Sequence, residues 1–138
     1  MTDVHPTERE LEILKILWRR GEATVREVYE EISRELPIVQ NTVQAFLRTM
    51  EEKGLVRHRL AGRTFVYAPV SKREQTSQKI VANLLQKVFD GAVDQLVDSA
   101  LSLKQPTAEE LDRLEALIRQ AKAASKSKSE RKQRRPGK

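Results

Sequence analysis

The hydrophobic pattern of this chain changes period near Gly54, and this change limits the possible folds more than any other feature. Before Gly54, apolar residues recur at helical spacing, which predicts amphipathic helices. After it, "LVRHRLA" and "TFVYAPV" alternate with a period near two, which predicts two short strands. The residues Gly62 and Arg63 separate the two strands, and such a short connection favours a hairpin. The sequence therefore predicts short helices followed by one β-hairpin.

The first two helices each open with a capping box, in which a Thr and a Glu three residues later satisfy each other's backbone N–H groups. Thr7 and Glu10 form the first box, and Thr24 and Glu27 form the second. Pro37 closes the second helix. These signals predict two helices before residue 38.

The third helix is predicted to begin at Asn41 or Thr42 and to end at Gly54. Its apolar face is expected to join the core through Val43, Phe46, Leu47 and Met50. The opposite face combines small, polar and basic groups: Asn41, Thr42, Gln44, Ala45, Arg48 and Thr49. In a helix-turn-helix, the second helix of the pair enters the major groove of DNA. These six residues are therefore our candidates for DNA binding on this helix.

The predicted hairpin is basic, with Arg57, His58, Arg59 and Arg63 close together and no acid among them. Three helices followed by such a hairpin describe a winged helix-turn-helix over residues 1–70. The three arginines are candidate contacts to DNA. The alternative is an edge strand that its charges protect against aggregation, and we prefer this alternative for His58.

The net charge of +6 is less informative than its distribution along the 138 residues. Positive and negative charges cancel over residues 1–70 and over 71–124, so the last fourteen residues supply the whole excess. Within the first segment, residues 1–39 are net negative and residues 40–70 are net positive. We therefore expect a polyanion to approach the second half of this segment.

Residues 71–124 are predicted to form short helices, with Thr107 and Glu110 as a third capping box. Helices this short cannot enclose a core alone, so their apolar stripes are expected to pair with a second copy of the chain. The alternative is that they fold back on the first segment. The candidate dimerisation residues are Ile80, Val81, Leu84, Leu85, Val88, Phe89, Leu96, Val97 and Leu101. Residues 125–138 are rich in Lys, Arg and Ser and are expected to be a disordered basic tail.

Composition argues against several other classes of protein. The chain has no cysteine, two isolated histidines and no clustered carboxylates, so we expect no metal, no cofactor and no enzyme activity. It has neither an apolar run long enough to span a membrane nor a secretory signal, so we expect a cytoplasmic protein. A protein-interaction adaptor and a regulator that responds to a small molecule remain as alternatives to a DNA-binding repressor.

Three stretches of the sequence together form a specific pattern: "PTERELEILKILWRRGEATVREVYEEI", "NTVQAFLRTMEEKGLV" and "GRTFVYAPV". This pattern resembles the penicillinase-repressor family of bacterial transcriptional regulators, which includes the methicillin-resistance repressor. The resemblance extends over about residues 6–103. It implies a winged helix, a helical dimerisation region and repression at an inverted-repeat operator on double-stranded DNA.

The same resemblance implies that the controlled genes serve β-lactam resistance. It further implies that a membrane-bound sensor peptidase triggers cleavage in the dimerisation region. Relatives often have Thr and Arg where this chain has Ala45 and Thr49, and here an Arg stands at position 48 instead. A one-residue move rotates a side chain by about 100° around a helix. The copper-responsive branch binds metal through C-terminal cysteines, so the lack of cysteine excludes that route.

Overall fold

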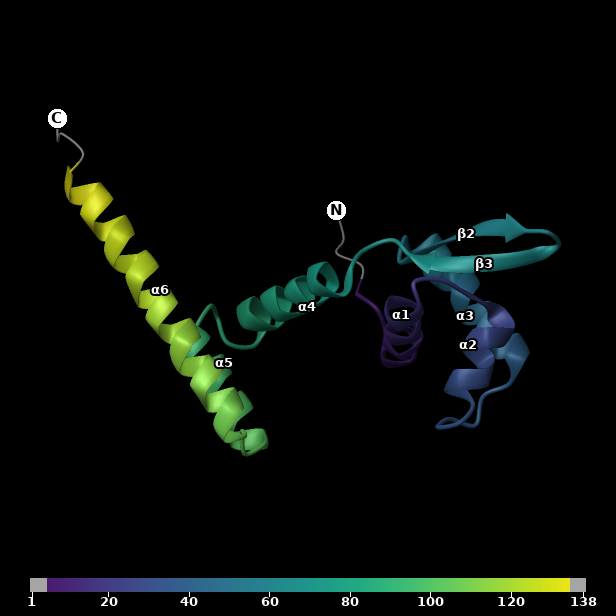
Figure 1. The fold of residues 1–138 in the computed structure, drawn as a ribbon, viewed down its shortest axis with the longest axis horizontal. Helices are drawn as coiled ribbons and strands as arrows, with labels where there is room; N and C mark the ends of the chain where they lie inside the picture. The colour runs from purple at the N-terminus through teal and green to yellow at the C-terminus, as the bar shows by residue number, and fades with distance from the viewer. Residues whose placement is uncertain (1–4, 135–138) are drawn as a thin grey trace. The chain divides into compact units, whose positions relative to one another are not determined.

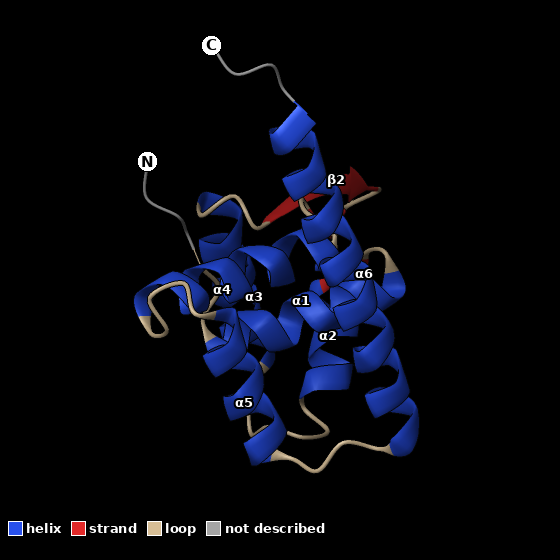
Figure 2. Ribbon diagram, turned by 90° about the vertical axis from the view of Figure 1, so that its left-hand side faces the viewer, coloured by secondary structure: helices blue, strands red, loops and turns tan. Residues whose placement is uncertain are grey.

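The computed structural model describes residues 5–134 of the chain (Figure 1). The chain divides into two compact units, residues 1–87 and 88–138. The first unit contains α1 (Glu8–Arg20), β1 (Ala23–Thr24), α2 (Val25–Ile32), α3 (Gln40–Glu52), β2 (Val56–Ala61), β3 (Thr64–Pro69) and α4 (Arg73–Lys87). The second contains α5 (Val93–Leu103) and α6 (Ala108–Arg134). The described strands all belong to the first unit, and the mainly helical class is confirmed (Figure 2).

Both predicted capping boxes of the first unit are present. The backbone N–H of Thr7 donates to Glu10 Oε1 at 2.9 Å, and the N–H of Glu10 donates to Thr7 Oγ1 at 3.3 Å. The corresponding bonds between Thr24 and Glu27 are 2.9 and 3.1 Å long. The bond from the Thr24 backbone also lowers the pKa of the Glu27 carboxyl, which keeps that carboxyl charged beside the positive end of α2.

The α2–α3 connection differs from the sequence prediction. The N-cap of α3 is Val39, so the expected start at Asn41 or Thr42 is wrong. Val39 has an extended backbone, and its carbonyl already accepts the N–H groups of Thr42 at 3.1 Å and Val43 at 3.2 Å. The helix therefore begins without help from a polar side chain.

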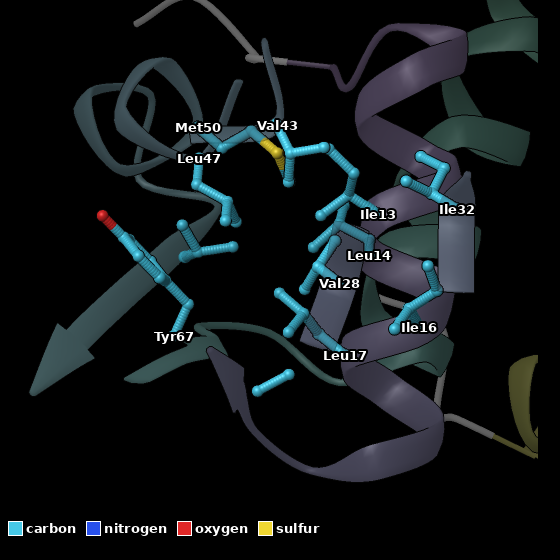
Figure 3. Packing of buried hydrophobic residues seen from close by; sticks show 12 residues of the cluster. Ile13, Leu14, Ile16, Leu17, Val28, Ile32, Val43, Leu47, Met50 and Tyr67 are labelled. Carbon is cyan, nitrogen blue, oxygen red and sulfur yellow. The ribbon is translucent and has the colours of Figure 1, made fainter. Parts of the chain in front are cut away.

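A single apolar core joins α1, α2 and α3 of the first unit to its sheet (Figure 3). Ile13 and Leu17 from α1, Val28 from α2, Leu47 from α3 and Tyr67 from β3 are each at most 2% exposed. Interiors of this kind are closely packed, so each helix is held at a defined rotation about its axis. The core thus determines which face of α3 is exposed to solvent.

The predicted hairpin is part of a three-stranded antiparallel sheet with the order β1-β3-β2. The strand β1 was missed by the sequence analysis because two residues are too few to show a period. Ala23 pairs with Tyr67, and Thr24 pairs with Val66. In this order β2 is an edge strand, so every second N–H group along it points away from its only partner.

The boundary between the units lies later than the predicted position at residue 70. The start of α4 belongs to the first unit, because Thr76 is buried there. The indole Nε1 of Trp18 also donates to the carbonyl of Ser71 at 2.9 Å, which ties α1 to the segment that leads into α4. The winged-helix unit therefore includes residues beyond the hairpin.

The prediction of a disordered tail is wrong for residues 125–134, because α6 continues through Arg134. Ala, Lys, Arg, Gln and Glu all have good helix propensity, and neither Gly nor Pro occurs between residue 107 and Pro136. The segment can therefore extend an existing helix without burying apolar surface. The remaining tail residues, 135–138, lie outside the described part of the chain.

Candidate nucleic-acid interface

The core exposes the predicted polar face of α3 as a continuous surface. Its apolar residues Val43, Leu47 and Met50 are fully buried. Phe46 is half-buried and packs against the core. The six predicted DNA-binding residues lie outside this core: Asn41, Thr42, Ala45, Arg48 and Thr49 are exposed, and Gln44 is half-buried. The structure therefore brings these six side chains onto one surface.

The charge along α3 is favourable for a polyanion at its N-terminal end. The only acids of this helix are Glu51 and Glu52, at its C-terminal end. No side chain caps the N-terminus of α3, so the backbone N–H groups of Gln40 and Asn41 donate to no capping side chain and carry the positive end of the helix dipole. Helix ends of this kind accept phosphate oxygens.

Arg63 lies at the tip of the hairpin formed by β2 and β3, which we call the wing. Gly62 precedes it with a φ of 68°, a conformation that side chains with a Cβ adopt rarely. Arg63 is exposed, and no carboxylate of the described residues forms an ion pair with it. This guanidinium is therefore available to an external anion.

Arg59 and Arg57 lie on the other face of β2 from His58, because side chains alternate along a strand. Arg59 lies opposite Val66 in the sheet and forms an ion pair with Glu22, with Nη2 at 2.6 Å from Oε1. The hydrogen bond to Arg59 lowers the pKa of the Glu22 carboxyl, and the bond to Glu22 raises the pKa of Arg59. The positive charge of Arg59 is thus paired with the carboxylate of Glu22, whereas Arg63 has no such partner among the described residues.

Arg57 lines a concavity of about 850 Å³ at the base of the wing. Trp18, Lys72 and Arg73 line the same concavity. The structure therefore groups Arg57 with the α1–α4 junction and not with the exposed face of α3.

Sequence reasoning missed the acidic partners that hold the wing. Glu22 bonds Arg59 across 37 positions of the chain, and Glu51 bonds His58 across seven. In each pair the two residues lie outside any shared helix or strand, so no periodic signal connects them and only the folded chain reveals the contact. From the sequence we preferred to interpret His58 as a solvated residue of a charge-protected edge strand. In the structure, its ring instead contacts the carboxylate of Glu51.

Two further observations concern other kinds of site. Over residues 5–134, no three or more His, Cys, Asp or Glu side chains come together in a way that could hold a metal ion. Within the same described range, no helix combines the length and apolar character that crossing a membrane requires.

Three packed helices, an exposed helix face of polar and basic residues, and a hairpin tipped with arginine define a winged helix-turn-helix domain of the DNA-binding class. The family model for the penicillinase repressor matches residues 6–120. The chain belongs to this family of DNA-binding transcriptional repressors, as the sequence predicted, and the family is not one of enzymes.

Curated relatives agree in length with this chain. The penicillinase repressor of Bacillus licheniformis is 26% identical over 120 residues, which cover 87% of this chain and 94% of that protein. The methicillin resistance regulatory protein MecI of Staphylococcus aureus (strain N315) is 20% identical over 109 residues, which cover 79% and 89%. The similarity therefore extends well beyond the winged helix in each case.

Solved structures with similarity to this chain cover about half of it. The solution structure of the DNA-binding domain of the repressor BlaI is 30% identical, covers 53% of this chain and 90% of that one, and has a TM-score of 0.47. The B. licheniformis BlaI monomer in complex with the blaP half-operator is 29% identical, with coverages of 53% and 89% and a TM-score of 0.47.

Proposed function

We propose that this repressor binds an inverted-repeat operator as a homodimer, with α3 of each copy in the major groove. The exposed face of α3, free of acids until Glu51, is the observation that carries this proposal. Arg48 has the donor geometry to bond the O6 and N7 atoms of guanine, and Ala45 offers a methyl group to thymine. Asn41, Thr42, Gln44 and Thr49 bond base edges or phosphates from the same surface.

The wing contributes a backbone contact in this proposal. Arg63 at its tip has no ion pair with any carboxylate of the described residues, so it binds a phosphate or enters the adjacent minor groove. Arg59 and Arg57 contribute less, because the former is paired with Glu22 and the latter lies in the concavity beside Trp18. We therefore rank Arg63 first among the three hairpin arginines.

Homodimerisation is supported by apolar faces that the single chain leaves uncovered. No residue of α5 is buried, and Val97 and Leu101 remain 37% and 39% exposed. A groove of about 520 Å³ lies between α5 and α6, and Leu96 and Leu117 line it together with these two residues. On α4, Val81 and Leu84 are 47% and 41% exposed.

Exposed apolar surface on this scale marks an interface, and a second copy is the simplest partner. The full proposed set is Ile80, Val81, Leu84, Leu85, Val88, Phe89, Leu96, Val97 and Leu101. A two-fold axis would place the two copies of α3 about 34 Å apart, in successive major grooves.

The names of two relatives support a proposal about the regulated genes. The two relatives are called penicillinase repressor and methicillin resistance regulatory protein. We propose that this chain represses β-lactam resistance or related genes in the cytoplasm. A membrane sensor peptidase pathway relieves the repression by cleaving the chain.

A gel-shift titration with the DNA upstream of the gene tests the DNA-binding part. The wild-type chain should bind an inverted repeat there more tightly than a scrambled duplex at physiological salt. Arg48→Ala should lose about 1–3 kcal/mol of this preference. Arg9→Ala is the matched control, because Arg9 is an exposed arginine on α1, outside α3 and the wing. Equal binding of both duplexes by the wild-type chain would leave a non-specific binder or an adaptor.

Sedimentation tests the dimer. Leu101→Asp should give monomers that bind the operator poorly, because a charge left unpaired in an apolar interface is costly. Ser102→Asp introduces the same charge at the next position and should leave the dimer intact. Dimers of Leu101→Asp as stable as those of the wild-type chain would place the interface elsewhere.

A further inference from the structure

The wing is connected to the C-terminal end of α3 by one carboxylate. Glu51 lies one residue before the end of α3, and His58 lies in β2. The Nδ1 atom of His58 is 2.8 Å from Glu51 Oε1 and 2.6 Å from Oε2. The backbone N–H of His58 donates to the same carboxylate, at 3.1 Å from Oε2. Three contacts therefore span the turn between α3 and the wing.

The backbone contact uses a group that the sheet leaves free. Because β2 is an edge strand, the outward N–H groups along it have no strand partner. Glu51 satisfies the N–H of His58 from outside the sheet. A hydrogen bond that involves a charged acceptor is stronger than a neutral one, so this contact fixes the edge of the wing relative to α3.

The ring of His58 continues the connection into the core. Its centroid lies 4.4 Å from that of Phe65 and 5.7 Å from that of Tyr67, its cross-strand partner. Tyr67 is 2% exposed, and its phenol is close enough to Glu51 for the carboxylate charge to raise its pKa, after the larger effect of burial. Glu51 thus contacts His58, whose ring packs against Phe65 and Tyr67, and Tyr67 is buried in the core.

We propose that Glu51 is a positioning residue for DNA binding: it sets the angle of the wing so that Arg63 and the exposed face of α3 meet the same duplex. This inference rests on the proposed contacts of α3 and Arg63 with DNA. Glu51 is an acid next to a surface that we propose binds a polyanion. A carboxylate with no positioning role would only repel the phosphates there. The positioning role and simple repulsion therefore predict changes of affinity with opposite signs.

Glu51→Ala and Glu52→Ala form a matched pair of variants. Both remove one carboxylate from the last turn of α3, and both put the same residue in its place. Glu52 is exposed and has no hydrogen bond to the described side chains, whereas Glu51 has three contacts to His58. Glu51→Ala should weaken operator binding about tenfold, because the wing then loses its preorganised angle. Glu52→Ala should leave binding unchanged or strengthen it.

Coupling to Arg63 separates positioning from a general loss of stability. In the wild-type chain, Arg63→Ala should weaken operator binding, and in Glu51→Ala the same substitution should have little further effect. Operator binding by Glu51→Ala that equals or exceeds the wild-type affinity would overturn the inference. An undiminished effect of Arg63→Ala in the Glu51→Ala background would also overturn it.

Amide relaxation measured by NMR on the free protein tests the same contact without DNA. Glu51→Ala should increase the motion of backbone amides 58–64, and Glu52→Ala should not. Unchanged amide motion in Glu51→Ala would reject the inference whatever the DNA result. A wild-type chain that ignores its operator would instead reject the proposed function, since the relaxation data report on the Glu51–His58 contact alone.

Discussion

Glu10 offers the sharpest quantitative test of the packing that positions α3. It lies on α1 and is 2% exposed. The Nζ atom of Lys53, the C-cap residue of α3, lies 2.8 Å from Glu10 Oε1 and 3.0 Å from Oε2. The N–H of Thr7 donates to the same carboxylate at 2.9 Å. This partly buried ion pair joins the beginning of α1 to the end of α3.

The pKa of Glu10 reflects opposing influences. Burial is the largest single one and raises the pKa, but the hydrogen bond and charge of Lys53 and the bonds from Thr7 together lower it below its usual range. A carboxyl whose pKa is lower in the folded state than in the unfolded state stabilises the fold above the unfolded pKa. This contribution is lost as the pH falls through the folded pKa.

Lys53→Met removes the charge and keeps much of the side-chain length. Breaking a buried pair by removing one partner costs about 3–5 kcal/mol. The Lys53 side chain is 30% exposed, and Thr7 still serves the carboxylate, so we expect the lower end, about 3 kcal/mol at neutral pH. Without Lys53, burial dominates and the pKa of Glu10 should rise. Acidification should then destabilise the variant less than it destabilises the wild-type chain.

Urea unfolding followed by circular dichroism, at pH 7 and at about pH 4, measures the loss of stability and its pH dependence. With an unchanged m-value, a shift of the urea midpoint reports the change in the free energy of unfolding. Lys15→Met is the matched control, because Lys15 pairs with Glu12 at 3.5 Å while their side chains are 54% and 44% exposed. Exposed pairs of this kind contribute about 0–1 kcal/mol. Equal losses in Lys53→Met and Lys15→Met would refute the reasoning. So would a Glu10→Gln/Lys53→Met double variant that is no more stable than Lys53→Met alone.

Three other substitutions test single features of the fold, each by urea unfolding. Leu47→Ala should destabilise the first unit by about 2–5 kcal/mol, because Leu47 is fully buried in the core; a loss under about 1 kcal/mol would contradict this packing. Gly54→Ala should cost about 1–2 kcal/mol through its φ of 81° alone, since an added Cβ meets no atom within 4 Å, and no loss would contradict the turn geometry. Thr24→Ala should cost about 0.5–2 kcal/mol by opening the capping box of α2, whereas Ser33→Ala, at a position as half-buried as Thr24 but at the other end of α2, should not.

Much of the fold was predictable because its signals are local. The capping boxes of α1 and α2 join residues three positions apart, and apolar spacing alone separates the buried face of α3 from its exposed face. Gly54 and Gly62 both have positive φ values at the turns where the sequence placed them. Such features depend on steric preferences and on hydrogen bonds within one or two turns of chain, so they can be read without the fold.

Local signals failed where two conformations were locally acceptable. A basic, Ser-rich segment reads as disordered by composition, yet nothing in residues 125–134 stops the helix α6 that precedes them. The two residues of β1 have too little length for a pattern and become a strand only because β3 lies beside them.

The sequence by itself determined the family, the three helices and wing of the DNA-binding unit, and the exposed candidate face of α3. The tertiary structure alone decided which polar and charged groups meet: Glu10 with Lys53, Glu22 with Arg59, and Glu51 with His58. Coulombic attraction and hydrogen bonding act at distances of a few ångströms, and only packing of the core brings residues as far apart in sequence as 10 and 53 within that range. For this reason the sequence could not show that Arg59 is paired with Glu22, whereas Arg63 at the wing tip has no ion pair among the described residues.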